Sequence, residues 1–200
     1  MSGELIRCFV AIDVFTPEIV RTVTGLGREL EEAGLVGKVV DPESLHITLQ
    51  FLGEIGKDLV ERVKEELSRI EFRPFPIRLE GVGYFPGGGR INVVWIGVRD
   101  PSGELHRLQG EVSSRLGALG LRPDKEFRPH ITFFRVKSVR NKPQVLEAIT
   151  RRANFEVGEL TVDRFKLKRS VLRPEGPLYS DLLVVRANRG EETSGPGLTG

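Results

Sequence analysis

The feature that most constrains this chain is the tripeptide His-Ile-Thr, which occurs twice, at residues 46–48 and 130–132. The two histidines are 84 residues apart. Side chains alternate between the two faces of an extended strand, so His46 and Thr48 share one face, as do His130 and Thr132 on a second strand. The isoleucine within each motif points to the opposite face. The repeat therefore predicts two strands, each with a polar face and a buried apolar face.

The same alternation extends the first of these strands beyond its threonine. It places Gln50 on the face of His46, and it places Phe51 on the apolar face with Ile47 and Leu49. Each strand would then offer an imidazole and a hydroxyl side by side, held by apolar side chains behind them.

The motifs lie within a longer pattern that also repeats. Apolar periodicity and turn residues predict, in each half, a strand, a helix, the His-Ile-Thr strand, a second helix and a further strand. The glycine-rich residues 81–89 are interpreted as a hairpin or an inter-lobe turn. The expected strands cover about 5–15, 45–53, 74–80, 91–98, 129–135, 155–171 and 178–186, and the expected helices about 17–33, 57–70, 101–119 and 144–152.

This repeat predicts an α+β fold with two αβ lobes related by an approximate twofold axis. We expect antiparallel-rich sheets that flank a central cleft, where the two His-Thr faces meet. Residues 1–186 would form a single two-lobed domain, with duplicated halves of about 1–86 and 87–186 that exchange strands between their sheets. Residues 187–200 have almost no apolar side chains, which predicts a disordered tail.

Composition excludes several classes of protein. The formal net charge is only +2, which argues against binding to long duplexes but allows a small anionic ligand or an RNA end. No apolar run approaches the ~18 residues that a membrane span requires. The N-terminus lacks the features of a signal peptide, and the lone Cys8 excludes a disulfide framework. We therefore expect a cytoplasmic protein that is not bound to a membrane.

The paired motifs suit one kind of chemistry in particular. An imidazole has an unperturbed pKa of about 6.5, so one histidine can accept a proton while a second donates one near neutral pH. In-line displacement at phosphorus needs both actions on opposite sides of the phosphate. Threonine hydroxyls can donate hydrogen bonds to its non-bridging oxygens. The residues alone thus predict phosphoester chemistry without a metal ion or other cofactor.

Other sites fit the sequence less well. Catalytic zinc usually takes three protein ligands, and neither motif has further His, Cys or acidic residues at ligand spacing. His106 lies on a predicted helix without the motif and is interpreted as a surface or packing histidine. The glycine-rich segment lacks the Lys-Ser/Thr ending of a P-loop, and no Gly-x-Ser-x-Gly nucleophile elbow is present.

The motifs and their flanks resemble the 2′-5′ RNA ligase / RNA 2′,3′-cyclic phosphodiesterase family, within the two-histidine phosphoesterase superfamily. The resemblance implies a bilobal α+β fold and hydrolysis of terminal 2′,3′-cyclic phosphates of RNA to 2′-phosphomonoesters. It further implies that His46 is the proton donor to the 3′ oxygen and His130 the base that activates water, roles that the residues alone leave open. Thr48 and Thr132 would bind the phosphate. The segments that carry the resemblance are residues 7–12, 45–54, 127–132 and 172–179.

The resemblance also implies a phosphate-binding role for an arginine five residues after the second histidine, where this chain has Arg135. Strict alternation places Arg135 on the face opposite His130, so a bulge or a strand end would be needed. Phe9, Phe51 and Tyr179 are candidates for stacking on a base, with core packing as the alternative for the first two.

Alternative functions remain open at this point. One is a 2′-5′ RNA ligase that joins tRNA halves, and another is a phosphodiesterase for 2′,5′-oligoadenylate or a small cyclic nucleotide. A third is a non-catalytic module that binds RNA ends or nucleotides. The expected partners are RNA 3′ ends or small cyclic-phosphate nucleotides, and the expected state is a monomer.

Overall fold

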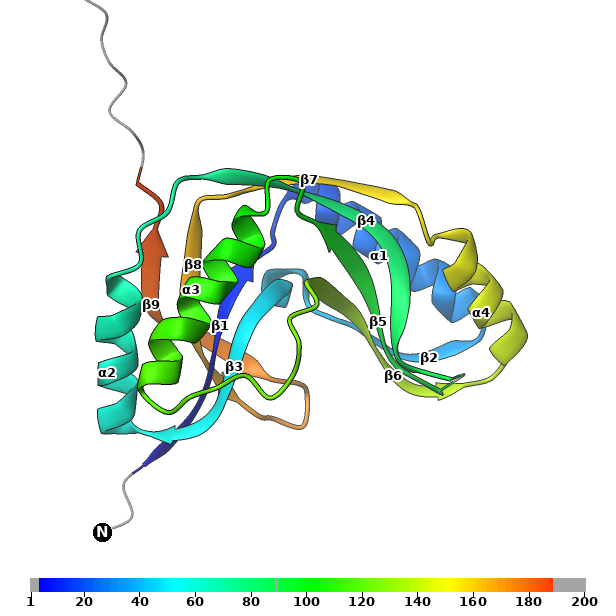
Figure 1. Cartoon of the computed structure of the whole chain (residues 1–200). Coiled ribbons are helices and arrows are strands. Elements are labelled where there is room, and N and C mark those ends of the chain that lie inside the picture. The colour runs from blue at the N-terminus through cyan, green and yellow to red at the C-terminus, as the bar shows by residue number, and fades with distance from the viewer. Residues whose placement is uncertain (1–3, 89, 189–200) are drawn as a thin grey trace, which may run out of the picture.

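A computed structural model describes residues 4–88 and 90–188 of the chain. Over these residues the fold is α+β, with strands that form one curled antiparallel sheet and helices on its convex side (Figure 1). The strands are β1 (Leu5–Asp13), β2 (Leu35–Val39), β3 (His46–Gly56), β4 (Phe75–Gly87), β5 (Arg90–Arg99), β6 (His130–Val139), β7 (Glu156–Val162), β8 (Arg164–Val171) and β9 (Leu178–Arg186). The helices are α1 (Pro17–Glu32), α2 (Lys57–Ser68), α3 (Glu104–Ala118) and α4 (Lys142–Arg151), with a 3₁₀ turn at Pro42–Ser44.

The sheet has two lobes that meet between β3 and β6. Its order is β7-β4-β5-β6-β3-β1-β8-β9. Strand β2 pairs with β6 on the side opposite β5, beyond the short contact of β6 with β3. Helices α2 and α3 pack on the lobe formed by β3, β1, β8 and β9, whereas α1 and α4 pack on the lobe formed by β7, β4, β5, β6 and β2 (Figure 1). The bilobal α+β fold is therefore confirmed. Helix α1 and strand β4, from the first half of the chain, belong to the lobe that contains β6. Helix α3, from the second half, belongs to the lobe that contains β3. Each lobe therefore combines elements from both halves of the chain.

The helices follow the signals in the sequence. Thr16 caps α1, and its Oγ1 accepts a hydrogen bond from the backbone N–H of Ile19 at 3.2 Å. Ile19, Val23 and Leu30, which recur at helical spacing on one face of α1, are buried in the core. None of the helices within residues 4–88 and 90–188 is long and apolar enough to cross a bilayer.

Helix α3 begins later than the sequence suggested. We expected Asp100-Pro101-Ser102 to open it, but the first helical residue is Glu104. Asp100 instead remains outside the helix, and its Oδ2 accepts hydrogen bonds from the backbone N–H of His106 at 3.0 Å and from Nδ1 of the same residue at 2.8 Å. The side chain of His106 is 57% exposed, so it is a surface histidine that orders the start of the helix.

The glycine-rich segment 81–89 is largely a strand rather than a connection. Strand β4 continues through it to Gly87, and only the end of the segment turns into β5. A side chain at Gly83 would collide with its cross-strand partner, because a Cβ there would lie 2.2 Å from the ring of Trp95. Glycine in this strand therefore makes room for an indole, a role that glycine content alone does not distinguish from a turn.

The short strand β2 was not predicted. Its middle residue is Gly37, which gives the segment a low strand propensity. A Cβ at Gly37 would lie 2.1 Å from the carbonyl oxygen of Arg135 on β6, so the close approach of the two strands requires glycine.

The end of the chain is described only in part. Ala187 donates a backbone hydrogen bond to the carbonyl of Asp163 at 2.8 Å, and Asn188 donates one to that of Phe72 at 2.8 Å. The remainder of the segment for which we expected disorder, residues 189–200, lies outside the described residues.

Candidate active site

The two His-Ile-Thr motifs lie side by side where the lobes meet. Strands β3 and β6 are antiparallel neighbours, and Ile47 pairs with Ile131. Both isoleucines are fully buried. The antiparallel pairing places His46 near Thr132 at one end of the contact, and Thr48 near His130 at the other. All four side chains are partly exposed, as alternation predicted, so the structure brings together the four residues of the expected site.

Each histidine is oriented by the same backbone hydrogen bond. Nδ1 of His46 lies 2.7 Å from the carbonyl oxygen of Ser44, and Nδ1 of His130 lies 2.6 Å from that of Arg128. Since a carbonyl oxygen only accepts, Nδ1 must carry the proton in both rings. Among the described residues, none hydrogen-bonds to either Nε2. Each Nε2 is therefore free to accept a proton when its ring is neutral and to donate one when it is charged.

Aromatic rings hold the imidazole of His46 from two sides. Its centroid lies 5.0 Å from that of Phe9 and 5.4 Å from that of Tyr179, and the last two rings are in edge contact at 5.2 Å. Phe9 is buried, in agreement with the core role weighed for it, whereas Tyr179 is partly exposed. The ring of His46 thus has little freedom to rotate.

His130 has an equivalent pair of aromatic neighbours. Its ring centroid lies 5.1 Å from that of Phe85 and 6.3 Å from that of Trp95. Both neighbours come from the β4–β5 hairpin, and their own rings are 5.2 Å apart. Sequence reasoning did not identify this pair, because Phe85 was assigned to the glycine-rich connection and Trp95 to an ordinary strand.

The environment of His46 favours its neutral form. Burial is the largest cause that lowers the pKa of His46, and the charges of Lys168 and Arg135 lower it further. The hydrogen bond to the Ser44 carbonyl and the carboxylate of Asp13, which pairs with His46 across β1 and β3, act in the opposite direction but do not compensate. His46 is therefore uncharged near neutral pH in the free protein.

An ionic network lies beside His46 on the same concave surface. The ammonium of Lys166 contacts Asp13 and Asp181, each at 2.6 Å, and that of Lys168 contacts the same carboxylates at 2.7 and 3.0 Å. The side chain of Lys168 is only 8% exposed. Two lysines that alternate with the buried Phe165 and Leu167 in β8 were the available sequence signal for this network, which we did not predict.

A bulge in β6 decides the position of Arg135. Thr132 pairs with Trp95 and Phe134 pairs with Val94, so Phe133 is an extra residue between them. Phe133 and Phe134 are both fully buried, and Arg135 emerges on the face of Thr132 and His130. Strict alternation, which placed Arg135 on the opposite face, is therefore wrong here, and the bulge required for it to approach the site is present.

Strand β3 carries the same irregularity at the equivalent place. Thr48 pairs with Ala11 and Gln50 pairs with Val10, which leaves Leu49 as the extra residue. Gln50 consequently turns into the core, where it is 3% exposed, and Phe51 turns out to the concave face, where it is 45% exposed. The predicted faces of these two residues are thus reversed, because the alternation shifts by one after the bulge.

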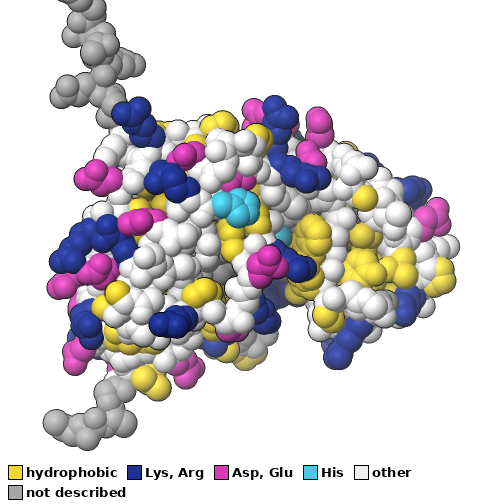
Figure 2. Space-filling view, in the orientation of Figure 1, with side chains coloured by type: hydrophobic (Ala, Val, Ile, Leu, Met, Phe, Trp, Pro, Cys, Tyr) yellow, Lys and Arg dark blue, Asp and Glu magenta, His cyan; other side chains and the backbone are white. Residues whose placement is uncertain are grey.

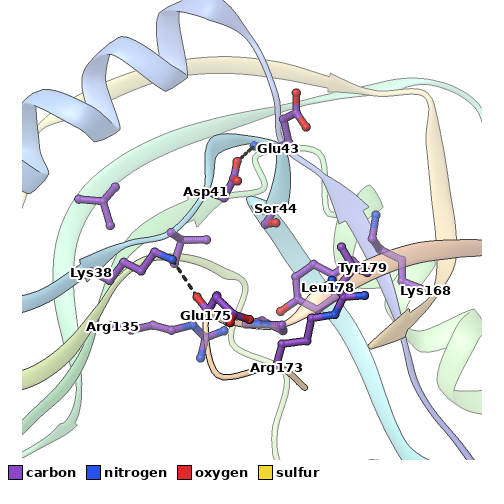
Figure 3. Close-up of a pocket in the computed structure, with 14 residues that line it drawn as sticks. Lys38, Asp41, Glu43, Ser44, Arg135, Lys168, Arg173, Glu175, Leu178 and Tyr179 are labelled. Atoms are coloured by element: carbon purple, nitrogen blue, oxygen red, sulfur yellow. Dashed lines mark hydrogen bonds between the residues drawn. The ribbon is translucent and has the colours of Figure 1, made fainter. Parts of the chain in front are cut away.

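A cavity of about 580 Å³ adjoins the His46 end of the site (Figure 3). Arg135 and Arg173 reach it from the two lobes, and among the described residues neither has a carboxylate partner. Lys38 on β2 donates a hydrogen bond to the backbone carbonyl of Glu175 at 2.8 Å, which links the β8–β9 loop to the opposite lobe (Figure 3). Tyr179 forms part of the wall. Two unpaired guanidinium groups make this cavity suitable for an anion.

A second cavity, of about 680 Å³, adjoins the His130 end. Its apolar wall is formed by Phe51, Phe85 and Phe127, and His130 and Thr48 also line it. In the space-filling view, hydrophobic side chains are visible along the hollow between the lobes (Figure 2). The two cavities therefore approach the four motif residues from opposite ends, one with unpaired cations and one with aromatic rings.

The described residues offer little for a metal ion. Within residues 4–88 and 90–188, no group of three or more His, Cys, Asp or Glu side chains is arranged to hold one. The arrangement at the motifs is instead two oriented imidazoles that can carry protons, with neighbouring hydroxyls and one nearby guanidinium. That set of groups can transfer protons and stabilise charge on a phosphate.

Comparisons with known proteins agree with this description. A model of the 2′-5′ RNA ligase superfamily matches residues 8–171. The chain is 46% identical over 179 residues to an RNA 2′,3′-cyclic phosphodiesterase of Archaeoglobus fulgidus, which covers 89% of this chain and 98% of that protein. It is 39% identical over 163 residues to an RNA 2′,3′-cyclic phosphodiesterase of Aeropyrum pernix, and this match covers 81% of this chain and 93% of that protein.

Solved structures show the same likeness. The crystal structure of Escherichia coli LigT complexed with 3′-AMP superimposes with a TM-score of 0.73 at 26% identity, covering 94% of this chain and 100% of LigT. The curled sheet and the two-lobed arrangement are thus shared with a protein that binds a nucleotide.

Proposed function

The chain belongs to the 2′-5′ RNA ligase superfamily, and we propose that it hydrolyses terminal 2′,3′-cyclic phosphates of RNA to 2′-phosphomonoesters without a metal ion. The observation that carries this proposal is the matched orientation of the two imidazoles. Each Nδ1 is bound to the carbonyl two residues before it, at 2.7 Å for His46 and 2.6 Å for His130, and no residue in the described part of the chain hydrogen-bonds to either Nε2. A single cyclic phosphate between them would contact one proton donor and one proton acceptor.

The proposed reaction is an in-line displacement. Nε2 of His130 accepts a proton from water as its oxygen attacks phosphorus, and Nε2 of His46 donates a proton to the departing 3′ oxygen. The hydroxyls of Thr48 and Thr132 donate hydrogen bonds to the non-bridging oxygens. After one turnover His130 is protonated and His46 is neutral, so exchange with solvent must restore both before the next.

His46 can act as the acid only if it is protonated, and its lowered pKa means that this protonation must accompany substrate binding. In the free protein, burial and two nearby cations favour the neutral ring. The phosphodiester is an anion, and an opposite charge next to an imidazolium stabilises the protonated form. We therefore infer that substrate binding is coupled to proton uptake by His46, with Arg135 sharing the same phosphate.

The proposed substrate is an RNA 3′ end or a small nucleotide that carries a cyclic phosphate. Curated relatives named RNA 2′,3′-cyclic phosphodiesterase support this class, as does the LigT structure with 3′-AMP. Both motifs come from one chain, which supports a monomer as the active unit. Cys8 supports a reducing compartment such as the cytoplasm, because it is buried and unpaired, and burial raises the pKa of its thiol to about 11.

The direct test is to incubate the protein with an oligonucleotide ending in a 2′,3′-cyclic phosphate, in the presence of EDTA, and to determine the position of the product phosphate. We expect a 2′-phosphate, and a loss of about 10²–10⁴-fold in rate in His46→Ala and in His130→Ala. His106→Ala is the matched control, since His106 carries no His-Ile-Thr motif and its Nδ1 is bound to Asp100 on the surface. Retention of the cyclic end without turnover would instead indicate a binding module.

A modified substrate separates the roles of the two histidines. A cyclic phosphorothiolate with sulfur in place of the 3′ oxygen has a leaving group that needs no general acid. We expect this substrate to restore most of the rate in His46→Ala and little of it in His130→Ala. The opposite pattern of rescue would show that the acid and base roles are exchanged.

A further inference from the structure

The cavity beside His46 extends beyond the groups that the proposed hydrolysis uses. We propose that it contains a second anion site, in which Arg173 and Lys38 bind a phosphate on the 5′ oxygen of the nucleoside that carries the cyclic phosphate. Two kinds of substrate have such a phosphate: an RNA chain, in which it joins the terminal nucleoside to the preceding one, and a mononucleotide with a 5′-phosphate. The inference rests on the proposed function, because it requires the cyclic phosphate to lie between the two histidines.

The position of the cavity determines which part of the substrate enters it. His46 donates its proton to the departing 3′ oxygen, so the ribose that keeps this oxygen lies at the His46 end. Tyr179 connects this end with the cavity, since its ring centroid is 5.4 Å from that of His46 and the residue also lines the cavity. The 5′ oxygen belongs to the same ribose. We therefore expect its phosphate to enter the cavity, whose volume of about 580 Å³ is in the range of sites that bind small molecules.

Cations from three separate elements line this cavity. Lys38 on β2 and Arg135 on β6 are cross-strand partners, and Arg173 comes from the β8–β9 loop. Neither guanidinium has a carboxylate partner in the part of the chain that the structure describes. In the proposed hydrolysis Arg135 binds the cyclic phosphate, which leaves Arg173 without a ligand. An unpaired guanidinium beside a bound nucleotide is suited to a second phosphate, because its N–H groups can bind two phosphate oxygens at once.

A hydrogen bond between the lobes holds the loop that carries Arg173. Nζ of Lys38 donates to the backbone carbonyl of Glu175 at 2.8 Å (Figure 3), and the backbone N–H of Gly176 donates to that of Arg173 at 3.1 Å. These bonds limit the movement of the loop, so less conformational entropy is lost when a phosphate binds. An ammonium group has three N–H donors, so Lys38 keeps two of them for the phosphate while it holds the loop.

Acidic residues restrict the second phosphate to one side of the cavity. Asp41 and Glu43, at the 3₁₀ turn before β3, lie towards one side, and Arg135 and Arg173 lie towards the other (Figure 3). Glu175 is exposed and forms no ion pair with any cation among residues 4–88 and 90–188, so it does not neutralise Arg173. Because like charges repel, a phosphate is favoured next to the arginines and disfavoured next to the 3₁₀ turn.

The test compares kcat/KM for three substrates: adenosine 2′,3′-cyclic phosphate, the same nucleotide with a 5′-phosphate, and an ApA dinucleotide with a 2′,3′-cyclic phosphate end. We expect the native chain to prefer substrates with a phosphate on the 5′ oxygen about 10–100-fold, the scale of a hydrogen bond to a charged group. Arg173→Gln should remove most of this preference. Arg173→Lys should keep part of it, because lysine supplies the charge without the paired N–H groups.

Arg169→Gln is the matched control. Arg169 lies on β8, the strand that leads into the same loop, where it pairs with Glu4 at 3.1 Å and lines neither cavity. The substitution changes the net charge by the same amount as Arg173→Gln, and the preference should stay as in the native chain. An equal loss of preference in the two variants would show a general effect of charge and would overturn the site.

Inhibition measures binding without turnover. Adenosine 2′,5′-bisphosphate and ApA ending in a 2′-phosphate are each compared with adenosine 2′-phosphate, and Arg173→Gln should remove any tighter binding of the first two. A preference confined to the dinucleotides would identify the phosphodiester of an RNA chain as the ligand, and one confined to the mononucleotides would identify a terminal 5′-phosphate.

Two outcomes would overturn the second anion site and leave the hydrolase intact. One is equal kcat/KM for the three substrates in the native chain, and the other is a preference in Arg173→Gln as large as in the native chain. Absence of hydrolysis of all three substrates would instead overturn the proposed function, and the inhibitors would still be free to report on the anion site through binding measured by calorimetry.

Discussion

Arg135 lies on the same face of β6 as His130, although the two residues are five positions apart and alternation would separate them. The cause is the bulge at Phe133, which uses one extra residue and shifts every later side chain to the other face. Arg135 is thereby placed close enough to His46 for its charge to lower the pKa of that imidazole. One inserted residue thus couples a guanidinium to the proposed acid.

The first prediction concerns this arginine. We expect Arg135→Gln to lower kcat/KM for cyclic phosphate hydrolysis about 10–100-fold, which corresponds to the ~1.5–3 kcal/mol of a hydrogen bond to a charged group. The same change should raise the pKa of His46, because a positive charge beside it is lost. Rate assays and NMR titration of the imidazole measure the two effects. Lys137→Gln, on the exposed end of the same strand, is the control, and equal behaviour of the two variants would exclude a role for Arg135.

The second prediction concerns the protonation of His46. In the free protein its imidazole should titrate below the ordinary value of about 6.5, and addition of a nucleoside 2′-phosphate should raise its pKa. Two-dimensional NMR of the ring nitrogens measures both values. Titration of His46 above 6.5 in the free protein would contradict the burial that the structure shows.

The same shift predicts how stability depends on pH. Between the folded-state pKa of His46 and about 6.5, the unfolded chain binds more protons than the folded chain. The free energy of unfolding should therefore fall as the pH is lowered from about 6.5 towards that lower value. In His46→Asn this contribution is removed, so the decrease seen by urea denaturation should be smaller than in the native chain.

The sequence was sufficient to identify the four motif residues, because period-two alternation holds from His46 to Thr48 and from His130 to Thr132. It failed immediately afterwards. Leu49 and Phe133 look like ordinary apolar strand residues, and nothing in their side chains marks them as the inserted residues of bulges. A bulge is decided by pairing with the neighbouring strand, which a single chain pattern does not contain.

Glycine caused the other errors in the fold. Gly83 and Gly37 both weaken the strand signal of their segments, yet both lie in strands, because Trp95 or the backbone of β6 occupies the space of a side chain. The ring partners of His130 and the ionic network beside His46 were missed for a related reason. Each is assembled from strands distant in sequence, and only the order of strands in the sheet brings them together.

The third prediction tests how the bulge in β3 is held. Gln50 donates a hydrogen bond to the carbonyl of Leu121 at 2.9 Å and accepts one from Ser113 at 2.9 Å. Gln50→Leu leaves these groups unpaired in the interior, so we expect the free energy of unfolding to fall by about 1–3 kcal/mol. Ser113→Ala should lower the free energy of unfolding by less than Gln50→Leu does. The double variant should lose less free energy of unfolding than the two single variants lose together.

Thermal and urea denaturation measure these differences. Gln144→Leu at the exposed start of α4 is the matched control, where we expect a change within about 0.5 kcal/mol. Additive effects of the Gln50 and Ser113 substitutions would show that the two side chains are not coupled.

The last prediction concerns the ionic network beside His46. Burial acts to raise the pKa of Asp181, but hydrogen bonds from Lys166 and Lys168 outweigh it and lower the pKa below 3.8. Asp181→Asn leaves both lysines to share Asp13, and Lys168 is almost fully buried. We expect the free energy of unfolding to fall by about 1–3 kcal/mol at neutral pH.

The pH dependence distinguishes this network from a surface pair. A carboxylate whose pKa is lowered by folding stabilises the protein at pH values above its pKa in the unfolded chain. This contribution is lost as the pH falls through about 3.9 and below. The difference in the free energy of unfolding between the native chain and Asp181→Asn should therefore become smaller at acidic pH. Glu159→Gln removes an ion pair with Arg78 in which both side chains are more than 60% exposed, so it should change stability by less than about 1 kcal/mol at any pH. Equal effects of the two substitutions at neutral pH would show that the charges around Lys168 are no more strongly coupled than a solvent-exposed pair.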